Sequence, residues 1–144
     1  MSESDFDGAV EAFRQAQGAF LKGDPVPVVK LFSRRDDATL ANPFGPPHLG
    51  WAQVAKATTE AAANFTGGSI RFAEVSRFTT PDLGYVVELE SIEVQVAGSG
   101  DMTPMSLRAT MIFRREGDTW KVAHRHADSV TTPRNVSSIV APSS

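Results

Sequence analysis

The sequence predicts an α+β domain in which three N-terminal helices pack on a curved antiparallel β-sheet. Helical periodicity is confined to the first 64 residues, and β-branched and aromatic runs separated by turn residues continue to about residue 129. The 144 residues, 41% of them hydrophobic and 22% charged, suit a single globular domain with its own core. A twisted sheet with helices over its concave face makes a cone, and its mouth is a natural ligand pocket.

Three helices are expected at the N-terminal end. The first spans residues 5–22, where large apolar side chains recur every three or four positions, and Gly23 ends it. The second begins at Asp24-Pro25, a helix cap followed by a proline in the first turn, and runs to about residue 33. The third is the alanine-rich segment 51–64, which the Gly67-Gly68 region follows.

The rest of the chain is expected to form the sheet. Residues 38–41 are short and strand-like, whereas residues 42–47 hold three prolines and a glycine, which exclude regular structure. Four strands with short turns then predict an antiparallel meander at residues 69–79, 84–96, 105–115 and 119–129. The domain should therefore cover residues 1–130, followed by a flexible Ser/Thr/Pro-rich tail at 131–144.

Composition excludes several function classes. No cysteine is present, which removes thiolate catalysis, zinc–thiolate sites and disulfides, and fits a cytoplasmic protein. The acidic start does not suit a signal peptide, and no apolar run approaches the ~18 residues of a membrane span. A net charge of −3 without a basic stripe argues against nucleic-acid binding. Phosphate-loop, dinucleotide, zinc-protease and serine-hydrolase motifs are absent, so no cofactor is expected.

Two parts of the chain resemble a known superfamily. Residues 36–45, DDATLANPFG, and Gly23-Asp24 resemble the corresponding segments of ketosteroid isomerases. The segments LRAT at 107–110, FRREG at 113–117 and HRHAD at 124–128 resemble the SnoaL-like branch of the nuclear transport factor 2 (NTF2) superfamily, and also the association domain of calcium/calmodulin-dependent kinase II. The resemblance covers about residues 8–130 and implies the NTF2-like cone. Since this scaffold carries isomerases, cyclases, dehydratases, binding proteins and oligomerisation modules, it leaves the function open.

The resemblance also excludes one activity. It places the catalytic base of the steroid isomerases at Asn42, their oxyanion-binding tyrosine at Ala16 and their protonated aspartate at Met111. An amide cannot abstract a proton at neutral pH, and neither alanine nor methionine donates a hydrogen bond to an oxyanion. The protein is therefore not expected to be a steroid isomerase, and its cavity is expected to lack a carboxylic acid that moves protons.

Several residues are candidates for binding a ligand in the cone. Asn42 either orients a ligand carbonyl or hydroxyl or shapes its own turn, while Phe44 and Trp51 flank the proline-rich loop. Strand alternation in the family register points Met111 and Phe113 inward with Leu107 and Ala109, and Arg125 inward with Ala123 and Ala127. A buried Arg125 needs an anion, which is either a carboxylate ligand or an internal acid such as a helix carboxylate.

The opposite parity defines a convex face. We expect it to carry a homodimer interface that includes Glu88, Glu90, Arg108 and His124, with Trp120, Val122 and His126 on the same side. A metal held by His124, His126 and a third ligand such as Asp128 or Glu90 is a weaker alternative. A β-bulge would reverse the parity and turn the histidines into the cavity, so His126 and Arg125 are the candidates for catalysis.

Three functions agree with these features. The first is a SnoaL-like protein that binds a small, mostly apolar ligand in the cone. The second is a SnoaL-like isomerase, cyclase or dehydratase that acts on a small carbonyl or polyketide-like compound, with Asn42, Arg125 or His126 as its polar groups. The third is an oligomerisation module. The missing acid–base groups favour the first.

Overall fold

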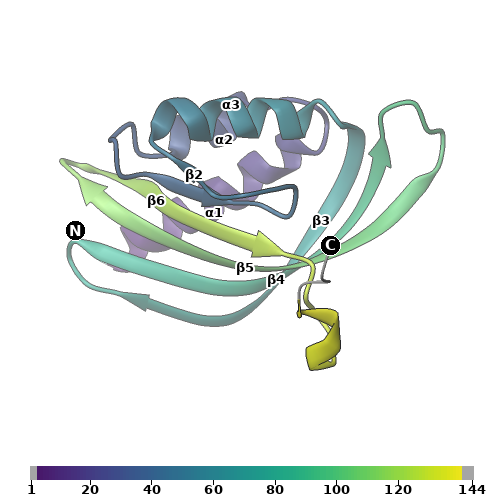
Figure 1. The fold of residues 1–144 in the computed structure, drawn as a ribbon. Coiled ribbons are helices and arrows are strands. Elements are labelled where there is room, and N and C mark those ends of the chain that lie inside the picture. Colours follow the sequence, from purple (N-terminus) through teal and green to yellow (C-terminus); the bar gives the residue numbers. More distant parts are fainter. Residues whose placement is uncertain (1–2, 141–144) are drawn as a thin grey trace.

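The computed structural model describes residues 3–140 as a layer of helices over one face of a curved sheet (Figure 1). The helices are α1 (Glu3–Phe20), α2 (Val26–Leu31) and α3 (Trp51–Ala62). The strands are β1 (Thr39–Ala41), β2 (His48–Leu49), β3 (Phe65–Thr79), β4 (Leu83–Val96), β5 (Met102–Glu116) and β6 (Thr119–Asp128). This arrangement confirms the predicted α+β class, with three N-terminal helices on a curved antiparallel sheet.

The sheet has the order β2-β1-β6-β5-β4-β3. Its long strands form the predicted antiparallel meander, and β1 joins β6 in parallel. The two-residue strand β2 was not predicted, because two residues after a proline-rich loop carry no periodicity. Within residues 3–140, no helix has both the length and the apolar character needed to span a bilayer.

Gly67 and Gly68 lie inside β3 rather than in the connection before it. The strand starts at Phe65, four residues earlier than predicted. A Cβ atom on Gly68 would lie 2.5 Å from the Glu93 carbonyl oxygen on β4, so only glycine allows the two strands to pair this closely. The glycine pair is therefore a close approach of two backbones and not a turn.

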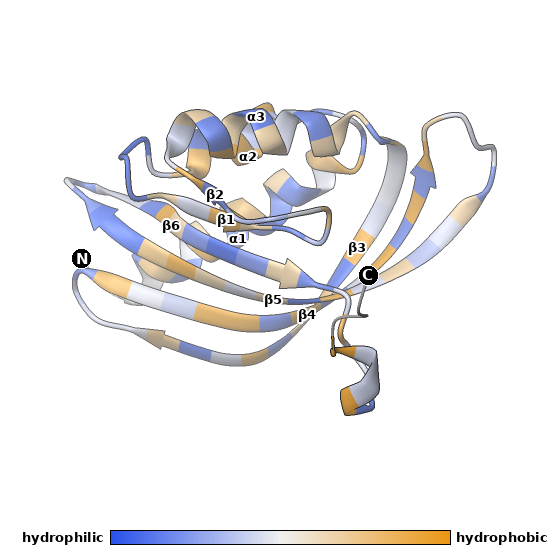
Figure 2. Cartoon of the chain, viewed as in Figure 1, coloured by the Kyte–Doolittle hydropathy of each residue, from blue (hydrophilic) through white to orange (hydrophobic). Residues whose placement is uncertain are grey.

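An aromatic cluster fills the space between the start of α1 and the concave face of the sheet. Phe6 on α1 meets the rings of Phe113 and Trp120 edge-on, at centroid distances of 5.3 and 5.2 Å. Gly84 on β4 leaves room for Phe6, since a Cβ atom there would lie 2.5 Å from the phenylalanine ring. Hydrophilic and apolar bands alternate along the strands in Figure 2, as expected for a sheet with one covered face.

A β-bulge in β6 changes which side chains face the helices. Ile112 pairs with His124 and Phe113 pairs with Val122, so Ala123 is an extra residue without a partner on β5. Trp120 and Val122 are consequently buried on the concave side, and their predicted place on the convex face was wrong.

The parity predicted for β4 was also wrong. Glu88 and Glu90, which we expected in the convex dimer interface, lie on the concave face and are 0% and 1% exposed. Leu89 faces the other way and is 41% exposed. Both faces of β4 carry aliphatic side chains, so hydrophobic alternation alone did not identify the covered one.

The C-terminal residues lie outside the cone. Residues 131–140 are exposed and include a single 3₁₀ turn, η1 (Val136–Ser138). In Figure 2 this turn carries apolar residues, and Val136 and Ile139 are among the exposed large hydrophobic side chains. Residues 141–144 of the predicted tail lie outside the described residues, and the flexibility of the tail stays a prediction.

Candidate functional site

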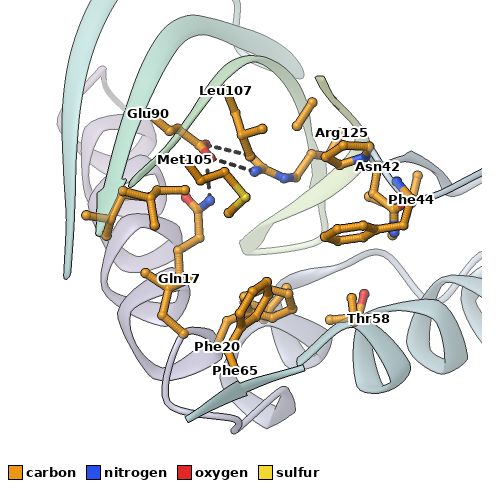
Figure 3. A pocket seen from close by; sticks show the side chains of 18 of the residues that line it. Gln17, Phe20, Asn42, Phe44, Thr58, Phe65, Glu90, Met105, Leu107 and Arg125 are labelled. Atoms are coloured by element: carbon orange, nitrogen blue, oxygen red, sulfur yellow. Dashed lines mark hydrogen bonds and ion pairs between the residues drawn. The ribbon is translucent and has the colours of Figure 1, made fainter. Parts of the chain in front are cut away.

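A cavity of about 70 Å³ lies between the helices and the concave face of the sheet (Figure 3). One water needs roughly 10–15 Å³ by this measure, so the cavity has room for several waters or a small organic fragment. Most of its wall is apolar and includes Phe20, Phe65, Met105 and Leu107. The polar side chains in the wall are Gln17, Asn42, Thr58, Glu90 and Arg125.

A buried ion pair forms part of the cavity wall. Arg125 on β6 donates from Nη1 to Glu90 Oε2 and from Nη2 to Glu90 Oε1, both at 2.9 Å (Figure 3). Gln17 on α1 donates from Nε2 to Glu90 Oε2 at 3.1 Å. Burial alone would raise the pKa of Glu90, but the charge and hydrogen bonds of Arg125 outweigh burial and lower it below its usual value. Glu90 is therefore a carboxylate at neutral pH, with donors on both oxygens.

Arg125 has an internal acid as its counter-ion, which is one of the two alternatives predicted for it. That acid comes from strand β4 rather than from a helix. The guanidinium also lies 5.8 Å from the centre of the Phe13 ring. The cavity wall thus contains a carboxylate, Glu90, which the sequence did not predict there. The expected absence of an acid that moves protons stays a prediction.

Glu88 belongs to a second buried pair that is not part of the cavity wall. Arg14 on α1 donates to Glu88 Oε1 from Nη2 at 2.6 Å and from Nε at 3.0 Å, and also to Glu74 at 3.0 Å. Glu88 Oε2 is buried without a hydrogen-bond partner among residues 3–140. Burial raises the pKa of Glu88 above its usual value, since one shared arginine does not fully offset the loss of water.

Asn42 and Phe44 lie at the mouth of the cavity. The backbone N–H of Phe44 donates to Asn42 Oδ1 at 3.1 Å, so the asparagine shapes its own turn and also lines the cavity. The Phe44 side chain is 56% exposed and also borders an outer groove of about 260 Å³ that contains His48, Glu60 and Asn64. Phe44 therefore separates the inner cavity from the outer groove.

The remaining predicted ligand-binding residues lie elsewhere. Met111 and Phe113 do face inward, but they are buried in the aromatic core and do not line the cavity. Trp51 packs at the edge of that core under the guanidinium of Arg34, at 4.8 Å. Of the predicted set, the cavity brings together Asn42, Phe44 and Arg125.

Sequence reasoning missed Gln17, Thr58 and Glu90 as wall residues. Gln17 follows Phe13 by four positions and precedes Phe20 by three, so the helical stripe itself contained the signal. Thr58 lies one turn beyond the buried Val54 on α3, which is an equivalent signal. Glu90 gave none, because its strand has apolar neighbours on both faces.

The two histidines of the HRHAD segment lie on the convex face. His124 Nδ1 shares a hydrogen bond of 2.8 Å with Thr39 Oγ1, and burial lowers the pKa of His124. His126 is exposed, with Nε2 3.0 Å from Asp128 Oδ2, and Arg108 donates to the same carboxylate. No group of three or more His, Asp or Glu side chains arranged to hold a metal occurs in the described part of the chain.

The fold and the cavity define a class of proteins: α+β cones in which a layer of helices covers a curved sheet and encloses a small internal site. The sequence of this chain matches the model of the SnoaL-like domain over residues 10–133. The chain therefore belongs to the SnoaL-like family, which confirms the resemblance inferred from the sequence. No protein with a curated description matches it.

Solved structures of the NTF2-like superfamily share the fold. A ketosteroid isomerase-like protein from Erwinia carotovora atroseptica is 17% identical, with a TM-score of 0.75 over 90% of this chain and 96% of that one. An NTF2-like superfamily protein from Salmonella enterica is 14% identical, with a TM-score of 0.76 over 92% of each chain. An NTF2-like protein of unknown function from Pseudomonas putida is 18% identical, with a TM-score of 0.74 over 97% and 92%. At these identities the likeness concerns the fold alone.

Proposed function

We propose that this protein binds a small, mostly apolar molecule in the cavity of the cone. The observation that carries the proposal is the wall itself, which is aromatic and aliphatic with a few polar side chains, one of them in a compensated ion pair. Cavities of this composition bind ligands by burying apolar area and orient them through isolated polar groups. The residues that we expect to contact the ligand are Asn42, Phe44 and Arg125, together with Gln17, Thr58 and Glu90.

The charge state of the wall favours binding over proton transfer. A general base needs a free oxygen and a pKa near the working pH. Glu90 has donors on both oxygens and a lowered pKa, and Glu88, whose pKa is raised, does not line the cavity. Neither carboxylate thus meets both conditions in this arrangement.

A fragment screen tests the proposal directly. We expect aromatic or carbonyl fragments to raise the melting temperature and to bind in ligand-observed NMR. Ala61→Leu places extra carbons in the cavity wall and should abolish these effects. Ala52→Leu, on the exposed side of the same helix, is the matched control and should leave them unchanged. Absence of any hit, or hits that survive Ala61→Leu, would contradict the proposal.

The alternative is a SnoaL-like isomerase, cyclase or dehydratase that acts on a small carbonyl compound. The observation that favours it is the Glu90 carboxylate in the cavity wall, which becomes a base if a ligand displaces one of its donors. Exchange of a bound fragment's C–H protons in D₂O, followed by NMR, separates the two functions. Exchange that Glu90→Gln abolishes would establish the enzyme.

We also propose that the convex face forms a homodimer. Phe78, Tyr85 and Leu89 are exposed on it, and Phe78 lies 5.9 Å from Tyr85 between ring centres. Arg108 and His124 lie on this face, whereas Glu88 and Glu90 are buried on the concave one. An apolar strip with paired charges beside it is suited to self-association.

A further inference from the structure

Thr58 is a buried residue whose hydroxyl group forms no hydrogen bond with residues 3–140. It lies on α3, is 4% exposed and lines the cavity. In Figure 3 its hydroxyl oxygen points into the cavity, toward the side where Phe44 lies. No other residue among 3–140 forms a hydrogen bond with it, whereas the hydroxyl of Thr59 donates to the Ala55 carbonyl at 2.8 Å. A buried hydroxyl in this state is available to a bound molecule.

Most of the other free polar groups in the wall are donors; the exception is Gln17 Oε1, a buried acceptor without a hydrogen-bond partner among residues 3–140. Asn42 uses its Oδ1 to accept from Phe44, and its amide N–H groups have no acceptor within the described residues. Arg125 commits one N–H from each terminal nitrogen to Glu90, which leaves further N–H groups of the five that a guanidinium carries. Glu90, the strongest acceptor in the wall, already receives three hydrogen bonds. The cavity therefore offers more donors than acceptors.

The net charge of the wall is close to zero. Arg125 and Glu90 are the charged residues that line the cavity, and they neutralise each other. A carboxylate ligand would bring a second anion beside Glu90, with one guanidinium to serve both. An ammonium ligand would face Arg125. Both meet like-charge repulsion in a mostly apolar cavity, so the wall selects against ions of either sign.

We infer that the ligand carries an uncharged oxygen acceptor, such as a ketone, ester or amide carbonyl, and that Thr58 donates to it. Asn42 supplies a second donor at the mouth of the cavity, while the apolar body of the ligand lies against Phe20 and Phe65. This inference rests on the proposed function and adds the chemical class of the ligand. It makes Thr58, a residue that no motif identifies, the determinant of specificity.

Four fragments of similar size test this inference: acetophenone, ethylbenzene, benzoate and benzylamine. We expect acetophenone to bind about five- to tenfold more tightly than ethylbenzene at pH 7, as measured by NMR titration, because one hydrogen bond contributes about that much. Benzoate and benzylamine should bind no better than ethylbenzene. Tighter binding of benzoate or benzylamine than of acetophenone overturns the inference.

Thr58→Val keeps the side-chain shape and removes the hydroxyl. It should weaken acetophenone about five- to tenfold and leave ethylbenzene unchanged, while Thr58→Ser should retain acetophenone within about twofold. Thr59→Val is the matched control, because that hydroxyl is already bonded to its own helix. Equal binding of acetophenone and ethylbenzene to the wild type overturns the inference and leaves the proposed function intact. If none of the four fragments binds, both this inference and the proposed function are contradicted.

Discussion

Glu88 and Glu90 extend from the same face of the same strand and are buried to the same degree, yet their pKa values move in opposite directions. Glu90 receives one N–H from each terminal nitrogen of Arg125, which forms an ion pair with no other acid among residues 3–140, and a third hydrogen bond from Gln17. Glu88 receives both of its hydrogen bonds on one oxygen, from an arginine that it shares with Glu74. Burial is common to the two sites, so the number and sharing of donors decides the sign of the shift.

The two ion pairs therefore differ in their place in the protein: the Glu90 pair is part of the cavity wall, and the Glu88 pair is not. The Glu90 pair holds its charges firmly at the cavity and sets its polarity. In the Glu88 pair, burial raises the pKa of the carboxyl group, because one shared arginine does not fully offset the loss of water. Three predictions test or refine the comparison.

The largest expected change in stability follows from the loss of Arg125. Arg125→Met should destabilise the fold by about 3–5 kcal/mol in urea unfolding at pH 7, because it leaves the Glu90 carboxylate buried without a counter-ion. Arg14→Met should cost less, about 1–2 kcal/mol, since Glu88 can take up a proton and Arg77 still pairs with Glu74.

A double variant serves as the control for this result. Combining Arg125→Met with Glu90→Leu should recover most of the lost stability, because no buried charge then remains. Equal losses for Arg125→Met and Arg14→Met would show that the two pairs are equivalent and would refute the comparison.

A smaller effect is expected from pH. The lowered pKa of Glu90 gives stability that is present above its ordinary value of 4.5 and lost as the pH falls further, so the cost of Glu90→Gln should shrink below pH 4.5. The raised pKa of Glu88 destabilises the fold at neutral pH, and this contribution disappears as the pH falls through the raised pKa, above 4.5. Wild type should therefore gain stability relative to Glu88→Gln between pH 7 and 4.5. Parallel stability profiles for the two variants would contradict the assigned directions.

The smallest effect on folding is expected at an exposed pair. Arg108 donates to Asp128 at 2.7 Å on the convex face, and this pair lowers the pKa of Asp128. Arg108→Glu should leave the unfolding midpoint nearly unchanged, because water screens the exposed pair, but should weaken the proposed dimer on the order of tenfold. Sedimentation equilibrium measures the dimer, and Glu11→Lys on exposed α1 is the control. An unchanged mass distribution for Arg108→Glu would count against this interface.

The helices and the long strands could be predicted from the sequence, because each of them has a strong local pattern. Phe6, Val10 and Phe13 repeat with helical spacing, and the turns between the strands carry glycine and aspartate. Two predictions of which strand face is covered were wrong, on β4 and on β6, because nothing in the local sequence identifies that face. Val87 and Leu89 resemble core residues as closely as Val86 does, so the covered face of β4 depends on what α1 presents to it, namely Arg14 and Gln17.

The candidate site was predicted in part for the same reason. Asn42 and Arg125 were found through the resemblance, which carries information on the fold around them, and Phe44 through its place beside the proline-rich loop. Gln17, Thr58 and Glu90 contribute to the cavity through contacts between elements far apart in the chain. The hydrogen bond from Gln17 to Glu90 spans 73 positions, and no window of sequence contains both residues.

The extra residue at Ala123 has a consequence for how such cones diversify. Arginine and histidine alternate along the segment after it, and the bulge lets Val122 before it and Arg125 after it face the same, inner side. A straight strand that kept Val122 inward would turn His124 and His126 into the interior, whereas one that kept Arg125 inward would turn Trp120 and Val122 outward. Alignments that match residue types without locating the irregularity will compare inner walls with outer surfaces, and new chemistry can arise here without a new side chain.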